Sequence, residues 1–163
     1  MWLISLIACI QPDIELLSLQ NAPVEIDTLA NVDDDGGLID SVDSVEVISK
    51  FEYRISETDN PEDFPIVLFG TYFVEYQIVG DEDVEIPPYK NELTGTLEPG
   101  SKPEVVFRAN SFTQTDWFAD EYNGSPVNTT AKVTFLFTEE GKDPATESFA
   151  VSGSFDAIFA DFL

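Results

Sequence analysis

Hydrophobic and polar positions alternate through most of the chain beyond residue 44. The first run, residues 45–55, places Val47, Phe51 and Tyr53 on one side and charged residues on the other. A period of two is typical of a strand with one buried face. Clusters of Gly, Pro, Asp and Asn interrupt the alternation, as turns do. The pattern predicts about seven strands, separated by turns roughly every ten residues.

The later runs follow the same rule. Their apolar positions are Val67, Phe69, Tyr72, Val74, Tyr76 and Ile78; Leu93, Gly95 and Leu97; Val105, Phe107 and Ala109; Val133, Phe135 and Phe137; and Phe149, Val151, Gly153 and Phe155. Residues 113–124 break the alternation. There we expect a short helix that is capped by Thr115, runs to Tyr122 and ends at Gly124.

Strands without long intervening helices favour an antiparallel sandwich over an α/β sheet. The predicted fold class is therefore all-β. Residues 72–78, 93–100 and the hairpin over 131–155 resemble the immunoglobulin-like sandwich domains that are common in exported bacterial lipoproteins. The resemblance covers residues 45–163 and implies an architecture used for spacer, adhesion or binding roles, without naming a ligand. The Cys pair of antibody domains is absent, because the chain has one Cys.

The segment before residue 45 has a different composition. Residues 10–49 contain ten acidic residues and no basic one. Like charges extend such a chain, and Pro23 and Gly36-Gly37 interrupt it further. We expect residues 9–44 to be an acidic, mostly irregular tether, although residues 15–19 have the composition of either a helical turn or a short strand.

The apolar run at residues 1–10 is too short to cross a bilayer, which takes roughly 20 apolar residues, and is typical of an export signal. Within it, Leu6-Ile7-Ala8-Cys9 resembles the lipobox of bacterial lipoproteins. The resemblance implies that Cys9 is acylated, that residues 1–8 are the remnant of a signal peptide, and that the protein is anchored in the cell envelope. Ile10 replaces the Asp of the family's inner-membrane retention signal, which favours the outer membrane. The alternative is a buried apolar strand with an inert Cys.

A calcium site is a second hypothesis for the tether. Asn31, Asp33, Asp35 and Asp40 supply oxygen ligands around Gly36-Gly37, and this spacing resembles the start of a calcium-binding loop. Val42 stands where an EF-hand needs a bidentate Glu, and a solvated acidic linker is the alternative interpretation. Two further acidic clusters, residues 81–85 and 139–143, lie in predicted turns and could also hold a divalent cation.

Charge and composition exclude several functions. The chain has 163 residues, 32 acidic and 7 basic side chains, no His and a net charge of −25. This charge excludes a basic nucleic-acid footprint, and the lack of His removes the commonest general base and the His-based metal sites. With so many acids, chance carboxylate pairs are expected, so a glycoside hydrolase using two carboxylates is a third hypothesis only.

Trp117, Phe118 and Tyr122 form either a plug at one end of the sandwich or an exposed binding patch. The function that the sequence favours is a non-enzymatic, lipid-anchored envelope protein with a structural or interaction role and no required cofactor. Its expected partners are the membrane and an unidentified protein or glycan. The alternatives are a calcium-dependent binding or adhesion module and the carboxylate hydrolase.

Overall fold

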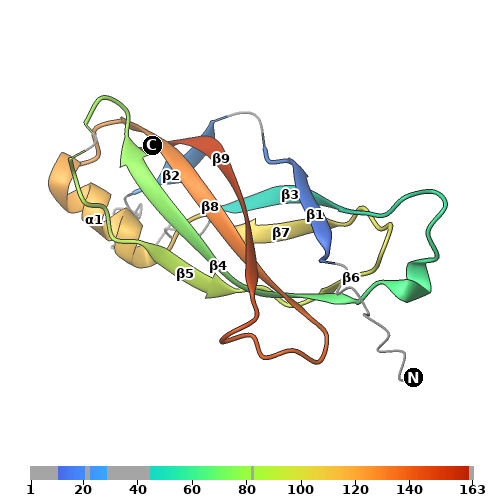
Figure 1. Ribbon diagram of the computed structural model, residues 1–163. Helices are drawn as coiled ribbons and strands as arrows, with labels where there is room; N and C mark the ends of the chain where they lie inside the picture. The colour runs from blue at the N-terminus through green and yellow to red at the C-terminus, as the bar shows by residue number, and fades with distance from the viewer. Residues whose placement is uncertain (1–10, 21–22, 29–44, 82, 162–163) are drawn as a thin grey trace, which may run out of the picture.

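The computed structural model describes residues 11–20, 23–28, 45–81 and 83–161, and it consists of two β-sheets packed face to face (Figure 1). The small sheet has the strand order β1-β3-β7, and the large sheet has the order β2-β9-β8-β4-β5, with β6 also paired to β4. The all-β sandwich prediction is confirmed, with nine strands in these residues rather than about seven.

The elements have the following bounds. The strands are β1 Asp13–Ser18, β2 Val24–Asp27, β3 Glu46–Arg54, β4 Val67–Ile78, β5 Tyr89–Glu92, β6 Thr96–Leu97, β7 Glu104–Arg108, β8 Val127–Glu139 and β9 Phe149–Ala160. The helix α1 spans Phe112–Tyr122, and a single 3-10 turn, η1, spans Pro61–Asp63.

The strand order is that of an immunoglobulin-type sandwich. β1, β3 and β7 take the places of strands A, B and E, and β9, β8 and β4 take those of G, F and C. The place beyond β7 in the small sheet holds no strand in the described part of the chain, so β7 has a free edge. The pairing is antiparallel, as predicted, except that β2 runs parallel to β9.

β1 and β2 belong to the sandwich, so the expectation of an irregular tether over residues 9–44 is wrong for these two strands. β1 pairs with β3, and β2 pairs with β9. Val24 and Ile26 in β2 are fully buried. Their alternation with two acids is only four residues long, which is too short to stand out in an acidic segment. The folded domain therefore begins well before residue 45.

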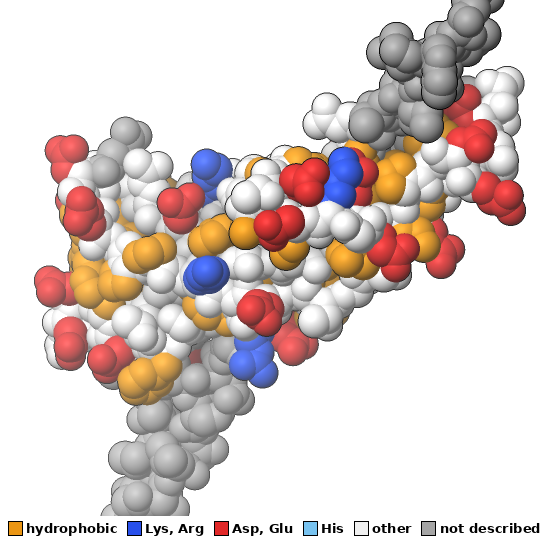
Figure 2. Space-filling model, turned by 60° about the horizontal axis from the view of Figure 1, so that its bottom comes forward, with side chains coloured by type: hydrophobic (Ala, Val, Ile, Leu, Met, Phe, Trp, Pro, Cys, Tyr) orange, Lys and Arg blue, Asp and Glu red, His pale blue; other side chains and the backbone are white. Residues whose placement is uncertain are grey.

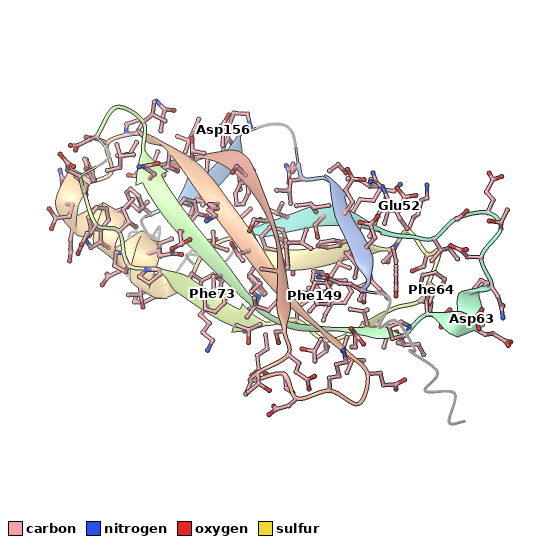
Figure 3. All side chains as sticks on the ribbon, in the orientation of Figure 1. Glu52, Asp63, Phe64, Phe73, Phe149 and Asp156 are labelled. Carbon is pink, nitrogen blue, oxygen red and sulfur yellow. The ribbon has the colours of Figure 1, made fainter. Side chains whose placement is uncertain are left out.

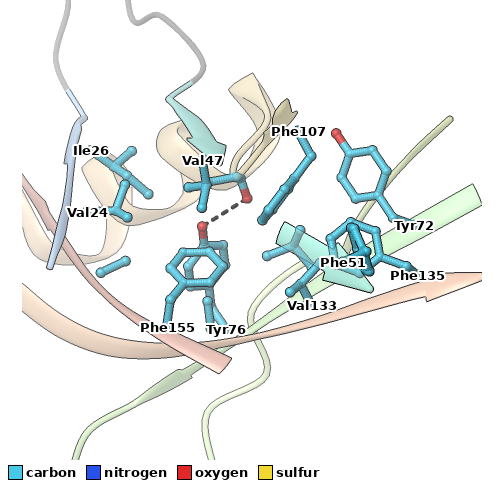
Figure 4. Packing of buried hydrophobic residues seen from close by; sticks show 14 of the residues in the cluster. Val24, Ile26, Val47, Phe51, Tyr72, Tyr76, Phe107, Val133, Phe135 and Phe155 are labelled. Carbon is cyan, nitrogen blue, oxygen red and sulfur yellow. Dashed lines mark hydrogen bonds between the residues drawn. The ribbon is translucent and has the colours of Figure 1, made fainter. Parts of the chain in front are cut away.

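Phe51 on β3 is at the centre of the contact between the sheets (Figure 4). Its ring meets Phe135 and Phe137 of β8 edge-on, with centroids 5.0 and 5.5 Å away. It also meets Phe69 of β4 at 5.4 Å. Edge-to-face contacts add to the free energy gained by burying such large rings. The alternation in β3, β4 and β8 thus predicted the core correctly.

Three buried tyrosines also connect separate parts of the backbone. The Tyr72 hydroxyl donates to the Arg108 carbonyl at 3.2 Å and accepts from the Arg108 N–H at 3.1 Å. The Tyr76 hydroxyl donates to the Ala109 carbonyl, shown dashed in Figure 4. The Tyr53 hydroxyl donates to the Pro65 carbonyl. Tyr72 and Tyr76 extend from the large sheet and bind the end of β7, so they hold the two sheets together through polar contacts.

Burial raises the pKa of Tyr72 to about 12, with a further contribution from the neighbouring Tyr89. Burial also raises the pKa of Tyr76 well above the ordinary tyrosine value. The neutral hydroxyl is therefore the form that the fold stabilises in both side chains.

The helix begins earlier than predicted. Thr115 does not cap it but lies inside it, with its hydroxyl donating to the Phe112 carbonyl. The start is set by Ser111, whose N–H donates to Gln114 Oε1 as in a capping box. The helix ends as expected, with Asn123 in the left-handed region before Gly124.

The predicted strand over residues 93–97 is also wrong in part. Two short strands, β5 and β6, lie on either side of residues 93–95 and both pair with β4. The chain turns at Gly95, whose φ of 149° is a conformation that favours glycine. Leu97 is nevertheless fully buried, as its place in the alternation required.

We expect Phe135→Ala to lower the free energy of unfolding by about 3–5 kcal/mol, because it removes a buried ring and leaves a cavity. Phe135 is 1% exposed and contacts Phe51, Tyr72 and Phe107. The matched control is Thr134→Ala on the outer face, with an expected change under about 1 kcal/mol. Urea unfolding of both variants measures the difference, and a reversed ranking would contradict the inward orientation of Phe135.

We expect the contribution of the buried Tyr72 to the stability to be complete below about pH 10 and to fall as the pH rises toward 12. The sign follows from the raised pKa of Tyr72: the unfolded tyrosine loses its proton first, so the stabilisation is complete below pH 10 and is lost through the folded pKa. Tyr72→Phe should cost about 1–3 kcal/mol at pH 8 and make the alkaline fall shallower. Urea midpoints at pH 8 and pH 11 test this, with Tyr122→Phe as the control.

Candidate functional site

The residues predicted to carry the lipid anchor and the calcium site lie outside the described residues. These are Leu6, Ile7, Ala8 and Cys9 for the anchor and Asn31, Asp33, Asp35 and Asp40 for calcium. Both hypotheses stay predictions. The structure describes only the strands that flank these two segments. β1 begins at Asp13 after the predicted anchor, and β2 ends at Asp27 and β3 begins at Glu46 on either side of the predicted calcium loop.

The acidic cluster at residues 139–143 lies in the turn between β8 and β9, and its side chains stabilise that turn. Glu139 forms an ion pair with Lys142 at 2.8 Å. Asp143 accepts hydrogen bonds from the Ala145 N–H and the Thr146 hydroxyl. Within residues 11–20, 23–28, 45–81 and 83–161, no three His, Cys, Asp or Glu side chains converge as a metal site would require.

The aromatic trio of the helical segment lies mostly inside the fold. Phe118 is fully buried and stacks on Phe159 of β9 with centroids 3.8 Å apart. Trp117 and Tyr122 are half-buried and pack against the core. These contacts favour the plug at one end of the sandwich over an exposed patch. The exposed ring on this helix is instead Phe112, which is 70% exposed.

Acidic side chains are spread over the surface. Figure 2 shows one face, on which many Asp and Glu side chains surround a few Lys and Arg. Hydrophobic side chains lie between them on the same face. The labelled Asp63 marks the end of the molecule at η1, and the helix α1 lies at the opposite end (Figures 1 and 3).

The outer face of the large sheet carries a pocket of about 350 Å³, which we call the leucine pocket. Its apolar lining comes from Leu68 of β4, Leu136 of β8 and Leu93 after β5. Its polar lining includes Thr138 and Ser148, whose hydroxyls are 2.8 Å apart, and Lys142 from the turn between β8 and β9. Glu92 and Lys142 add one charge of each sign to the lining, so it suits a ligand without net charge that is held by apolar contact and a few hydroxyls.

A local irregularity in β4 shapes this pocket. The register between β4 and β8 shifts between Phe69 and Tyr72, which is a β-bulge at Gly70 and Thr71. A Cβ at Gly70 would lie 3.2 Å from the Leu136 carbonyl oxygen, tighter than ordinary contact, so glycine lets the two strands approach here. The bulge thus distorts β4 at Gly70 and Thr71, two of the residues that line the pocket.

The pattern of the sequence did not predict this pocket, although the sequence contains a signal for it. Leu68 and Leu136 occupy outward positions of their strands, where the alternation calls for polar residues. Each sits in an unbroken apolar run, residues 66–69 and 135–137. Uninterrupted apolar runs within alternating strands indicate that both faces of the sheet are partly covered.

A second cleft, of about 410 Å³, separates β1 from the free part of the β9 edge. Ser152, Gly153 and Ser154 form one wall, and Leu16 to Gln20 form the other. A Cβ at Gly153 would lie 2.5 Å from a methyl of Leu16 and 2.9 Å from one of Leu19. Gly153 therefore allows β1 to pack over β9, and we interpret this cleft as part of the packing of β1.

Comparison with known proteins leaves the family open. No protein-family model and no curated protein matches the sequence. A solved structure of a protein from Archaeoglobus fulgidus aligns with 18% identity and a TM-score of 0.42, covering 91% of this chain and 99% of that chain. Across the part of the chain that the structure describes, no helix is long and apolar enough to span a bilayer.

We expect the leucine pocket to bind a neutral apolar dye such as Nile red, and Leu136→Asp to weaken that binding by about tenfold or more, because a charge replaces an apolar contact worth at least about 1.4 kcal/mol. Fluorescence titration measures the dissociation constants. The matched control is Val79→Asp, since Val79 is 65% exposed and lies outside the pocket. Equal loss in both variants would show that the dye binds elsewhere.

Proposed function

We propose that this chain is a lipid-anchored protein of the bacterial cell envelope, located at the outer membrane, whose sandwich domain has a non-enzymatic structural or interaction role. The observation that carries the proposal is the lipobox-like sequence Leu6-Ile7-Ala8-Cys9. It is followed four residues after the Cys by the first strand of a folded sandwich.

The short distance between Cys9 and β1 changes how such an anchor would work. The chain from Cys9 to Asp13 can span at most about 14 Å, so the domain would stand directly on the membrane without a long tether. Asp13 pairs with Arg54, at the end of β3 that leads to η1. That end of the sandwich would therefore be nearest to the bilayer.

The charge of this end supports attachment through the lipid alone. Glu57, Asp59, Glu62 and Asp63 are all exposed there. Carboxylates are repelled by anionic headgroups, which attract basic segments instead. An acidic protein of this kind needs a covalent anchor to stay at a membrane, and two or more acyl chains give stable attachment.

We expect Cys9→Ser to move the protein from the membrane fraction to the soluble fraction, because the lipid would be its only anchor in this proposal. Cell fractionation and mass spectrometry of the amino-terminal peptide measure the change. Ser5→Ala, in the same apolar run, is the control and should stay in the membrane fraction. A Cys9→Ser protein that stays membrane-bound, or an unmodified Cys9 in the native protein, would overturn the proposal.

A further inference from the structure

The outer face of the small sheet differs from the rest of this acidic surface. Four of the seven basic residues of the chain lie on it. They stand among four acids, with Asp13 at the margin as a fifth. The eight central charged residues are Glu15, Glu46, Glu52, Glu104, Lys50, Arg54, Lys102 and Arg108. The face is thus close to neutral on a protein of net charge −25.

Several of these charged residues form ion pairs with one another. Arg54 pairs with Glu15 of the neighbouring strand. Glu52 pairs with Lys102 at 2.6 Å, and Lys50 pairs with Glu104 at 3.6 Å. Glu52 lies on the side of β3 that is turned away from the large sheet (Figure 3).

The centre of the face is apolar and exposed. Ile48 on β3 lies directly opposite Val106 on β7, and they are 54% and 47% exposed. These are two of the five large hydrophobic side chains that are exposed in the described part of the chain. An apolar centre inside a ring of charges is the usual anatomy of a protein–protein interface.

The charges around this centre form an alternating pattern. On β3, Glu46 and Lys50 lie on either side of Ile48, and on β7, Arg108 and Glu104 lie on either side of Val106. The register places Glu46 opposite Arg108 and Lys50 opposite Glu104. Opposite charges therefore alternate both along each strand and across the two strands.

This pattern is complementary to itself. A twofold axis that runs across the strands through Ile48 and Val106 brings a second face onto the first. Glu46 then meets Lys50 of the second copy, and Arg108 meets Glu104 of the second copy. The apolar pair meets its own copy. We propose that this face binds a second copy of the chain and forms an isologous dimer.

The register sets the extent of the contact. An axis across the strands through Ile48 and Val106 superposes residues 46–50 of β3 and 104–108 of β7 on the same residues of the second copy, and it leaves β1 outside the contact, because β1 pairs with residues 50–54 of β3. An axis along β3 would instead bring Glu46 onto Glu46 and Lys50 onto Lys50, which places like charges together. An axis along the strands midway between β3 and β7 would bring Glu46 onto Arg108, so it predicts no rescue when Glu46→Lys and Lys50→Glu are mixed. We assign the axis across the strands, which predicts that rescue.

The net charge of the protein favours this face over the rest of the surface as the site where two copies meet. Two copies of charge −25 repel each other wherever their carboxylates meet, and a near-neutral face removes most of that local repulsion. The contact is small: five residues of β3 and five of β7 overlap with their copies and cover roughly 160 Å², about a fifth of what each partner buries in a typical stable complex. The dimer is therefore weak and depends on concentration.

Sedimentation velocity of the full chain from about 10 µM to 1 mM, the range suited to weak association, tests the proposal at physiological salt. The expected result is a reversible monomer–dimer equilibrium. Ile48→Asp should weaken it by about tenfold or more, because it places a charge at the apolar centre. Val79→Asp, which adds the same charge at another exposed apolar position, should leave it unchanged.

A mixing experiment tests the charge pattern itself. Glu46→Lys and Lys50→Glu should each be monomeric alone, because each places like charges opposite one another in the dimer. An equimolar mixture of the two should form a heterodimer, since positions 46 and 50 then carry opposite charges again wherever the two copies meet. Thermal melting confirms that both variants are folded.

Three results would each overturn the proposal. The first is a native chain that stays monomeric up to the highest concentration. The second is association that survives Ile48→Asp. The third is a mixture of the two charge variants in which both folded proteins stay monomeric. None of these results depends on whether Cys9 carries lipid, so the anchor and the dimer are tested separately.

Discussion

The structure depends most on the contact that Phe51 makes across the sandwich. β3 and β8 hold the places of strands B and F, which a disulfide joins in antibody domains. The only Cys of this chain is Cys9, so no such bond is available. Phe51 of β3 instead meets Phe135 and Phe137 of β8, and the three rings are buried together. Van der Waals contact and burial replace the covalent link, which makes this core independent of the redox conditions around it.

The polar contacts between the sheets serve a different purpose. The Tyr72 hydroxyl binds both the N–H and the carbonyl of Arg108, at the edge of β7. It thereby satisfies two backbone groups that a neighbouring strand would otherwise pair. Exposed edges invite uncontrolled pairing with other chains. The side chain of one sheet thus protects the end of an edge strand in the other, and leaves the outer face of the small sheet free.

The sequence predicted the long strands well and the short ones poorly. In β3, β4 and β8, large apolar residues alternate over nine residues or more, so burial of one face dictates the register. In β2 only Val24 and Ile26 carry the signal. Their burial depends on pairing with β9, more than a hundred residues away, which no local pattern contains. The leucine pocket was missed for a related reason: Leu68 and Leu136 face outward, and only the tertiary structure brings Leu93 beside them.

The parallel pairing of β2 with β9 has a mechanical consequence. The four residue pairs from Val24–Ala157 to Asp27–Ala160 join a strand near the start of the chain to its last strand. A pull on the two ends of the chain draws parallel neighbours in opposite directions along their length. The hydrogen bonds between them are then sheared together instead of being opened one after another. Once β1 has separated from β3, this short ladder is what resists further extension, before the longer antiparallel pairs are loaded.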